Sequence, residues 1–155
     1  MKKVRTLLLL LSLSISTLGW AHEKNHASNA MVKGLDTPAA QVVMSFHHAL
    51  ETGDKKLARK HLADDVQIFE GGNIERSADQ YAHHHMLSDM KYLAAVETKM
   101  LEHQIKIMGN TAVSMSKSQT QGTYKGKLKD YQGMETMVLE KQDGQWKIVH
   151  IHWSH

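Results

Sequence analysis

Apolar residues recur at helical spacing in the first part of this chain and at alternating spacing in the rest. Thr37 followed by Pro38 is typical of a helix start, because a threonine hydroxyl can cap the first turn and proline suits the first helical position. The apolar residues Val43, Phe46 and Leu50 then fall on one helical face. The pattern predicts a first helix that ends at the threonine–glycine pair shortly after them.

Two more helices and a strand are predicted before the alternating pattern begins. A short helix, KKLARKHL, runs into a short strand, VQIFE. Ser77 and Gln80 form a capping-box pattern, which predicts a third helix from there to about Glu97. This helix carries three consecutive histidines.

The last part of the chain reads as four strands, LEHQIKIM, TAVSMSKSQTQ, GMETMVLEK and QWKIVHIHWSH. Gly109-Asn110 and Asp143-Gly144 are predicted turns, and YKGKLKD is predicted to cross over between the second and third strands. Helices followed by an antiparallel meander predict an α+β domain over residues 37–155. Three N-terminal helices are expected to pack on one face of a curved antiparallel sheet.

The first 21 residues form a separate segment. A basic start, MKKVR, precedes the apolar run LLLLLSLSISTL and the small residues of GWA, so we predict a secretory signal peptide at residues 1–21, cleaved after Ala21. A membrane anchor is the alternative, but the apolar run is short for a span. We expect export to the periplasm. Residues 22–36 are polar and without period, and are predicted to be a mobile arm.

Removal of the leader changes the charge of the chain. Lys2, Lys3 and Arg5 leave with it, so 16 of the 19 basic residues remain against 16 acidic ones. A chain without net charge gives no support for a nucleic-acid partner or, after leader removal, a membrane partner. The chain has no cysteine, so its core and not disulfides must hold the exported domain together.

Three segments carry a resemblance to a known family. ETGDKKLARKHLADDVQIF resembles the helix–turn–strand opening of the SnoaL-like branch of the nuclear transport factor 2-like superfamily. METMVLEKQDGQWKIVHIHWSH is similar to the last hairpin of that branch, and also to the association domain of calcium/calmodulin-dependent kinase. GGNIERSADQYAHHHMLSDMKYL is similar to a segment of exported members. The resemblance covers roughly residues 37–155.

This resemblance implies a cone-shaped fold in which a bent sheet wraps a long helix and leaves a pocket at the open end. It also implies a homodimer through the outer face of the sheet. It does not fix an activity, because the superfamily includes isomerases, dehydratases, cyclases, binding modules and assembly domains. The function must therefore be argued from the site.

The closing hairpin supplies the first candidate site residues. If Asp143-Gly144 is a two-residue turn, regular pairing places Leu139 opposite Ile148 and, farther along, Glu135 opposite His152. Met137 is then opposite His150, and one face carries a group of residues that grades from apolar to polar: Glu135, Met137, Leu139, Trp146, Ile148, His150 and His152. We interpret this face as a pocket floor; the alternative is that it faces solvent or a dimer partner.

The histidine run supplies the second candidate. His85 and Asp89 are four residues apart on the predicted third helix, and a carboxylate that orients an imidazole is the minimal general-base arrangement. Tyr81 lies in line with this pair. His84 points away from the apolar stripe, although the resemblance favours the adjacent His84-His85 pair. A plain helix-surface pair is the alternative reading.

Three further residues have weaker predicted roles. Glu70, at the end of the first strand, could rim the pocket mouth. His47 borders the apolar face of the first helix, and His103 shares a strand face with Ile105, so we expect a hydrogen-bonded core histidine there.

Metal binding is the remaining possibility for these histidines. Glu135, His150 and His152 could contribute ligands to zinc or copper, and cleavage after Ala21 would leave His22 with a free amine able to chelate Cu(II). No fixed ligand spacing supports a firm metal site, so no cofactor is predicted.

Three functions follow in order of preference. The first is an exported domain that binds a small, partly apolar molecule in a pocket ringed by histidine, aspartate and glutamate. The second is a cofactor-free isomerase, dehydratase or cyclase that uses a His–carboxylate pair. The third is a periplasmic copper- or zinc-binding protein.

Overall fold

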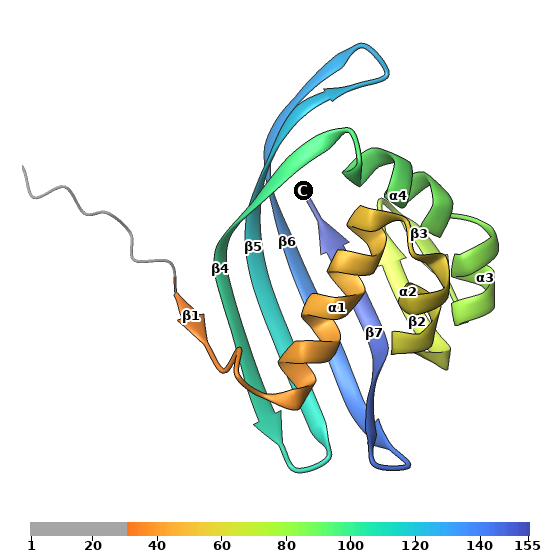
Figure 1. Ribbon diagram of the computed structural model, residues 1–155, viewed down its shortest axis with the longest axis vertical. Helices are drawn as coiled ribbons and strands as arrows, with labels where there is room; N and C mark the ends of the chain where they lie inside the picture. The colour runs from red at the N-terminus through yellow and green to blue at the C-terminus, as the bar shows by residue number, and fades with distance from the viewer. Residues whose placement is uncertain (1–30) are drawn as a thin grey trace, which may run out of the picture.

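The structure is a computed structural model that describes residues 31–155, an α+β domain with helices on one side of a curved sheet (Figure 1). The described residues form four helices: α1 (Pro38–Thr52), α2 (Lys55–His61), α3 (Ala78–His83) and α4 (Met86–Leu93). They also form seven strands: β1 (Val32–Lys33), β2 (Leu62–Glu70), β3 (Asn73–Glu75), β4 (Val96–Met108), β5 (Thr111–Tyr124), β6 (Lys127–Gln142) and β7 (Gln145–Ser154). The predicted fold class is confirmed.

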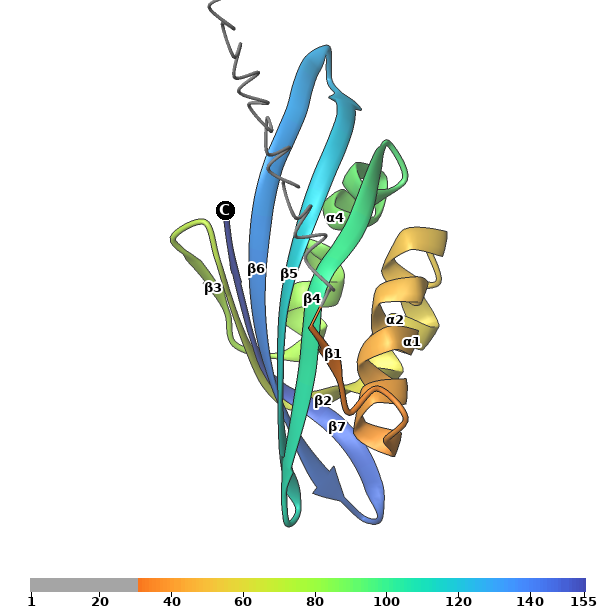
Figure 2. The same cartoon turned by 90° about the vertical axis from the view of Figure 1, so that its left-hand side faces the viewer.

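The sheet is mixed, not purely antiparallel. Its strand order is β1-β4-β5-β6-β7-β2-β3, and the meander from β4 to β7 is antiparallel as predicted. The two exceptions are β1 beside β4 and β2 beside β7, which pair in parallel. Figure 2 shows the helices together on one side of the sheet, which leaves its other face without a helix.

The first helix begins and ends where the sequence predicts. The Thr37 hydroxyl accepts a hydrogen bond from the Ala40 amide over 3.3 Å, and proline occupies the first turn. Gly53 ends the helix in the left-handed conformation, with φ of 76°. The predicted face is fully buried at Val43 and Phe46, and it packs α1 against the concave side of the sheet.

The third predicted helix is broken in two. The prediction of one helix from Ser77 to about Glu97 is wrong, because α3 ends at His83, α4 begins at Met86, and β4 has started by Val96. At the break the His85 ring contacts the Glu75 carboxylate, which is only 5% exposed. A contact with a distant, buried charge therefore overrides the local helical pattern.

Two connections also differ from prediction. YKGKLKD does not cross over; instead Tyr124 pairs with Lys127 in a tight β5–β6 hairpin, with Lys125 and Gly126 at positive φ. Residues 22–30 of the predicted arm lie outside the described residues. Val32 and Lys33 form β1 against β4, so the end of the arm is docked on the sheet. No described helix is long and apolar enough to cross a membrane.

Candidate functional site

The closing hairpin has a register shift that reorganises the predicted site. Leu139 pairs with Ile148 as predicted, but the next pair is Val138 with His150, because one residue of β7 is left without a partner. Beyond this bulge Glu135 pairs with Trp153, not with His152. Side chains alternate between the two faces of a strand, so the bulge turns the end of β7 over.

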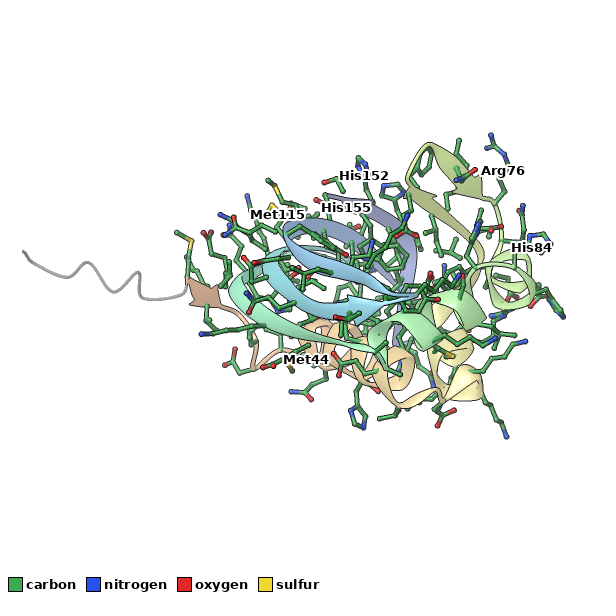
Figure 3. The ribbon with its side chains drawn as sticks, turned by 90° about the horizontal axis from the view of Figure 1, so that it is seen from above. Met44, Arg76, His84, Met115, His152 and His155 are labelled. Atoms are coloured by element: carbon green, nitrogen blue, oxygen red, sulfur yellow. The ribbon has the colours of Figure 1, made fainter. Side chains whose placement is uncertain are left out.

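His150 and His152 therefore lie on the outer face of the sheet, and their prediction as pocket residues is wrong. The His150 ring packs against Phe69, with ring centroids 5.4 Å apart. His152 is exposed. Figure 3 shows Met44 of α1 on one side of the sheet, with His152 and Met115 on the other. Trp146 packs against the core and does not line a cavity, so its predicted role is also not supported.

A cavity of about 340 Å³ lies between α1, α4 and the concave face of the sheet. Its apolar wall includes Met44, Leu50, Leu93 and Met100. Its polar groups come from elements far apart in the sequence, which the curved sheet brings together around α1. Cavities of this size and mixed lining are typical of small-molecule sites.

Glu135 forms the polar floor of this cavity. It is 7% exposed, and its carboxylate accepts hydrogen bonds from Trp153 Nε1 at 2.7 Å and from Ser116 Oγ at 3.4 Å. The His47 ring, on α1, lies 3.1 Å from the same carboxylate. Burial raises the pKa of Glu135, but the charge and hydrogen bond of His47 and the hydrogen bond of Trp153 outweigh it, so the pKa lies below its usual value.

His47 shows the matching shift. Burial lowers the pKa of this ring, yet the charge and hydrogen bond of Glu135 and the charge of Glu51 together outweigh burial, and the pKa of His47 is raised. The two groups therefore form an imidazolium–carboxylate pair that joins α1 to the sheet. The sequence placed His47 only at the edge of the helix's apolar face. Its partner is 88 residues away, and no local signal joins them.

His103 lies beside this pair on β4. It is 1% exposed, and its Nε2 is hydrogen-bonded to Ser114 Oγ at 2.8 Å, as expected for a core histidine. Its Nδ1 is buried without a hydrogen-bond partner in the described part of the chain. Burial lowers the pKa of His103, although the nearby Glu135 raises it. A neutral ring is therefore favoured, and the residue borders the cavity.

The other end of the cavity is acidic. Glu70, from the end of β2, and Asp89, from α4, both line it. Asp89 accepts a hydrogen bond from the buried Tyr81 hydroxyl at 2.8 Å. Burial raises the pKa of Asp89, and although the Tyr81 hydrogen bond lowers it, the pKa stays above its usual value. Burial and the charge of Asp89 likewise raise the pKa of Glu70.

A smaller cavity of about 240 Å³ adjoins this acidic end and is lined in part by Glu70, Glu75, Tyr81 and His85. The His85 ring contacts Glu75, and His84 Nδ1 lies 3.6 Å from the same carboxylate. The Asp89 amide donates to the His85 carbonyl over 3.0 Å at the start of α4, but no side-chain hydrogen bond or ion pair joins the two residues within residues 31–155. Each side chain has a different partner, so the predicted catalytic pair does not form.

The predicted metal ligands are not brought together. Glu135 faces the cavity, while His150 and His152 face outward on the other side of the sheet. Across residues 31–155, no group of three or more histidine, aspartate or glutamate side chains has a geometry that could hold a metal ion. His22 lies outside the described residues.

The chain resembles one known family and a number of solved structures. The family described as calcium/calmodulin dependent protein kinase II association domain matches residues 38–155. No curated protein matches. A crystal structure from Shewanella frigidimarina NCIMB 400, described as a candidate ketosteroid isomerase, is 52% identical over 79% of this chain and 99% of its own, with a TM-score of 0.78.

Two other solved structures share the fold at lower identity. A candidate association domain of the same kinase from Xanthomonas campestris is 23% identical, covers 83% of this chain and 95% of its own, and has a TM-score of 0.63. The association domain of the C. elegans kinase is 22% identical over 74% of this chain and 91% of its own, with a TM-score of 0.60.

Proposed function

Because the chain belongs to the family of calcium/calmodulin dependent protein kinase II association domains, within the nuclear transport factor 2-like superfamily, we propose that it uses its cavity to bind a small, partly apolar molecule. The cavity of about 340 Å³ would hold a ligand between α1 and the concave face of the sheet. The SnoaL-like branch stays a prediction. The sequence-based prediction of a pocket is kept, but His150 and His152 are no longer part of it.

Glu135 carries this proposal. Met137 and Leu139, the next residues on the same face of β6, are fully buried apolar groups, as a packed core requires. Burying a carboxylate costs several kcal/mol unless donors compensate for lost water, so stability alone favours another apolar residue at this position. Here three donors hold the carboxylate at the edge of a cavity. Such a prepared polar group beside open space is typical of a ligand site.

Filling the cavity tests this proposal. Ser118 lines the cavity on β5, and Ser118→Phe would occupy part of it. Met115→Phe, on the outer face of the same strand, is the matched control. A library of small molecules is titrated into labelled protein, with the Trp153 indole N–H resonance as the reporter. We expect ligands that shift it in the wild type and the control but not in Ser118→Phe. Ligands that shift this resonance equally in all three proteins would contradict a ligand site here. So would the absence of any ligand that shifts it in the wild type.

Proton-transfer catalysis is a second candidate, supported by a different observation. The 52% identical relative is described as a candidate ketosteroid isomerase, and a half-buried Asp89 with a raised pKa is suited to take up a proton. The test is the conversion of a β,γ-unsaturated 3-ketosteroid to its conjugated isomer, followed by ultraviolet absorbance. Activity that is lost in Asp89→Asn would support it. A wild-type rate equal to that of buffer would reject it.

We also propose a homodimer through the outer face of the sheet. Two relatives are described as association domains, and this face exposes Met115, which is 37% accessible. Light scattering of the purified protein tests it. A dimeric mass that becomes monomeric in Met115→Lys is expected, and a monomeric wild type would contradict it.

Export to the periplasm stays a proposal that rests on the leader. The test is to fractionate cells that express the full chain and to sequence the N-terminus of the periplasmic protein. A mature protein that begins at His22 is expected. Retention of Met1 in the cytoplasm would contradict it.

A further inference from the structure

Acidic side chains dominate the charge of both cavities. The larger is lined by the carboxylates of Glu51, Glu70, Asp89 and Glu135, and the smaller by those of Glu70 and Glu75. None of the lysines and arginines that the structure describes lines either one. The only side chains there that can carry positive charge are histidines. A ligand that enters therefore meets a negative surface.

The acidic groups converge where the two cavities meet. Glu70 lines both cavities, and Tyr81, which lines the smaller one, donates its hydrogen bond to Asp89 in the larger one. Glu75 reaches the same region from β3. Three carboxylates from β2, β3 and α4 thus lie near the buried Tyr81, and one of them accepts its hydrogen bond.

Not all of this charge is balanced within the protein. Glu135 is matched by His47, and one Glu75 oxygen is matched by His85. The other Glu75 oxygen is buried with no hydrogen-bond partner in residues 31–155, and the exposed His84 ring lies 3.6 Å from it. The Glu70 side chain makes no hydrogen bond or ion pair within these residues, and the Asp89 carboxylate bonds only to the neutral Tyr81 hydroxyl, although the charge of His85 partly lowers the pKa of both acids. Unpaired, partly buried carboxylates are costly unless a cation joins them.

We infer that the ligand of this site is an organic cation, a primary or secondary amine with an apolar body, whose ammonium group binds between Glu70 and Asp89. This inference rests on the proposed function, because it names the class of molecule that the cavity binds. The apolar body lies toward Leu93 and Met100, and the hydroxyl-bonded rings of Tyr92 and Tyr131 face it from α4 and β6. Aromatic faces also attract ammonium groups.

Two further considerations agree with a cation. Burial raises the pKa of both Glu70 and Asp89, and repulsion from a neighbouring carboxylate adds to it, from Asp89 for Glu70 and from Glu75 for Asp89, so a bound ammonium would relieve a cost that the protein carries. An anionic ligand would add a like charge to the same region, where the interior dielectric makes repulsion stronger than in water. The site therefore disfavours carboxylates and phosphates.

Three probes with one apolar body and different head groups test the inference. Phenethylamine, 2-phenylethanol and phenylacetate are titrated into the purified full-length domain, and binding is followed by the Trp153 indole N–H resonance and by calorimetry. The amine is expected to bind at least about tenfold more tightly than either of the others. Equal or tighter binding of the alcohol or the acid would overturn the inference while leaving the proposed function intact. Failure of all three to bind would count against the proposed function itself.

Charge-neutral variants then locate the ammonium group. Glu70→Gln/Asp89→Asn is expected to weaken phenethylamine binding at least about tenfold and to leave 2-phenylethanol binding unchanged. Glu140→Gln/Asp143→Asn, which removes two exposed charges from the far end of the sheet, is the matched control. If the double variant fails to fold, Glu70→Gln alone replaces it, because the Glu70 side chain has no hydrogen bond or ion pair to lose within residues 31–155. Unchanged amine binding in a folded Glu70→Gln protein would overturn the assignment.

Discussion

Trp153 and Glu135 lie directly opposite each other on β7 and β6, and the indole N–H of Trp153 donates to Glu135 Oε2 over 2.7 Å. The tryptophan is therefore both a wall of the cavity and the donor that fixes its floor. Because Glu135 is 7% exposed, water cannot readily replace this donor. The pair joins the last strand of the sheet to the cavity.

The first prediction concerns this hydrogen bond. Trp153→Phe is expected to lower the free energy of unfolding by about 1 to 3 kcal/mol, because it removes a donor from a buried carboxylate. Urea unfolding measures the change. Trp146→Phe is the control, because Trp146 packs against the same core but donates no hydrogen bond to a described side chain. Equal losses in the two variants would mean that only ring volume matters at residue 153.

The second prediction concerns the pH dependence of stability from the His47–Glu135 pair. The folded pKa of His47 is raised, so its contribution is complete below its usual value of 6.5 and is lost as pH rises through the folded pKa. The folded pKa of Glu135 is lowered, so its contribution is complete above its usual value of 4.5 and is lost as pH falls through the folded pKa. The pair should stabilise the fold most between these two values.

Urea unfolding of the wild type and Glu135→Gln at a series of pH values measures this effect. The difference in unfolding free energy between the two proteins should shrink as pH rises above the usual value of His47. Glu140→Gln, on the exposed end of β6, should show no such trend. A difference that grows toward alkaline pH would contradict an imidazolium–carboxylate pair.

The sequence predicted the parts of the fold whose causes are local. The cap at Thr37 and the apolar face of α1 lie within a few turns of each other, so periodicity and propensity were enough. The hairpin turn at Asp143-Gly144 and the pair Leu139–Ile148 followed in the same way. Membership in the superfamily gave the curvature that a single sequence does not show.

The site was harder, because two non-local events determine it. Regular pairing from the turn placed His150 and His152 in the pocket, and one bulge in β7 exchanged them for Ile151 and Trp153. A bulge leaves no sequence signal in a strand with apolar residues on both faces. At the helix break the Glu75–His85 contact gave the His85 ring a partner other than Asp89 in a similar way. Glu70 and Asp89 both line the cavity, as the sequence predicted.

The third prediction tests whether the segment before α1 is docked on the sheet. Gly34 has φ of 77°, and a Cβ added there would lie 2.6 Å from the carbonyl oxygen of Ile105. Gly53 has nearly the same φ, 76°, but a Cβ added there meets no atom within 4 Å. Left-handed strain costs both alanine variants about 1 to 2 kcal/mol, and Gly34→Ala bears the clash in addition.

The readout is hydrogen exchange together with urea unfolding. The His103 amide donates to the carbonyl of Met31 over 2.9 Å, so its protection reports on β1. Gly34→Ala should speed exchange of this amide and destabilise the protein more than Gly53→Ala, which should leave the amide protected. Equal exchange in both variants would show that β1 does not depend on the close approach at Gly34.

The last prediction concerns the acidic end of the cavity. Tyr81 is fully buried and donates to Asp89 Oδ2 over 2.8 Å, which favours the charged carboxylate. Tyr81→Phe keeps the ring and removes the donor, so the pKa of Asp89, already raised by burial, should rise further. An acid whose folded pKa lies above its usual value destabilises the fold as pH rises between the two values. Tyr81→Phe should therefore widen the pH range over which Asp89 costs stability.

Carbon-detected NMR titration of the Asp89 carboxyl group measures this pKa directly. Tyr131→Phe is the matched control, because the Tyr131 hydroxyl bonds to Tyr92, 2.7 Å away, and not to a carboxylate. It should leave the Asp89 titration unchanged. A fall in the Asp89 pKa on Tyr81→Phe would mean that the hydroxyl stabilises the protonated acid instead. The carboxylate could not then be the charged partner of an amine, and the ammonium group would have to bind to Glu70 alone.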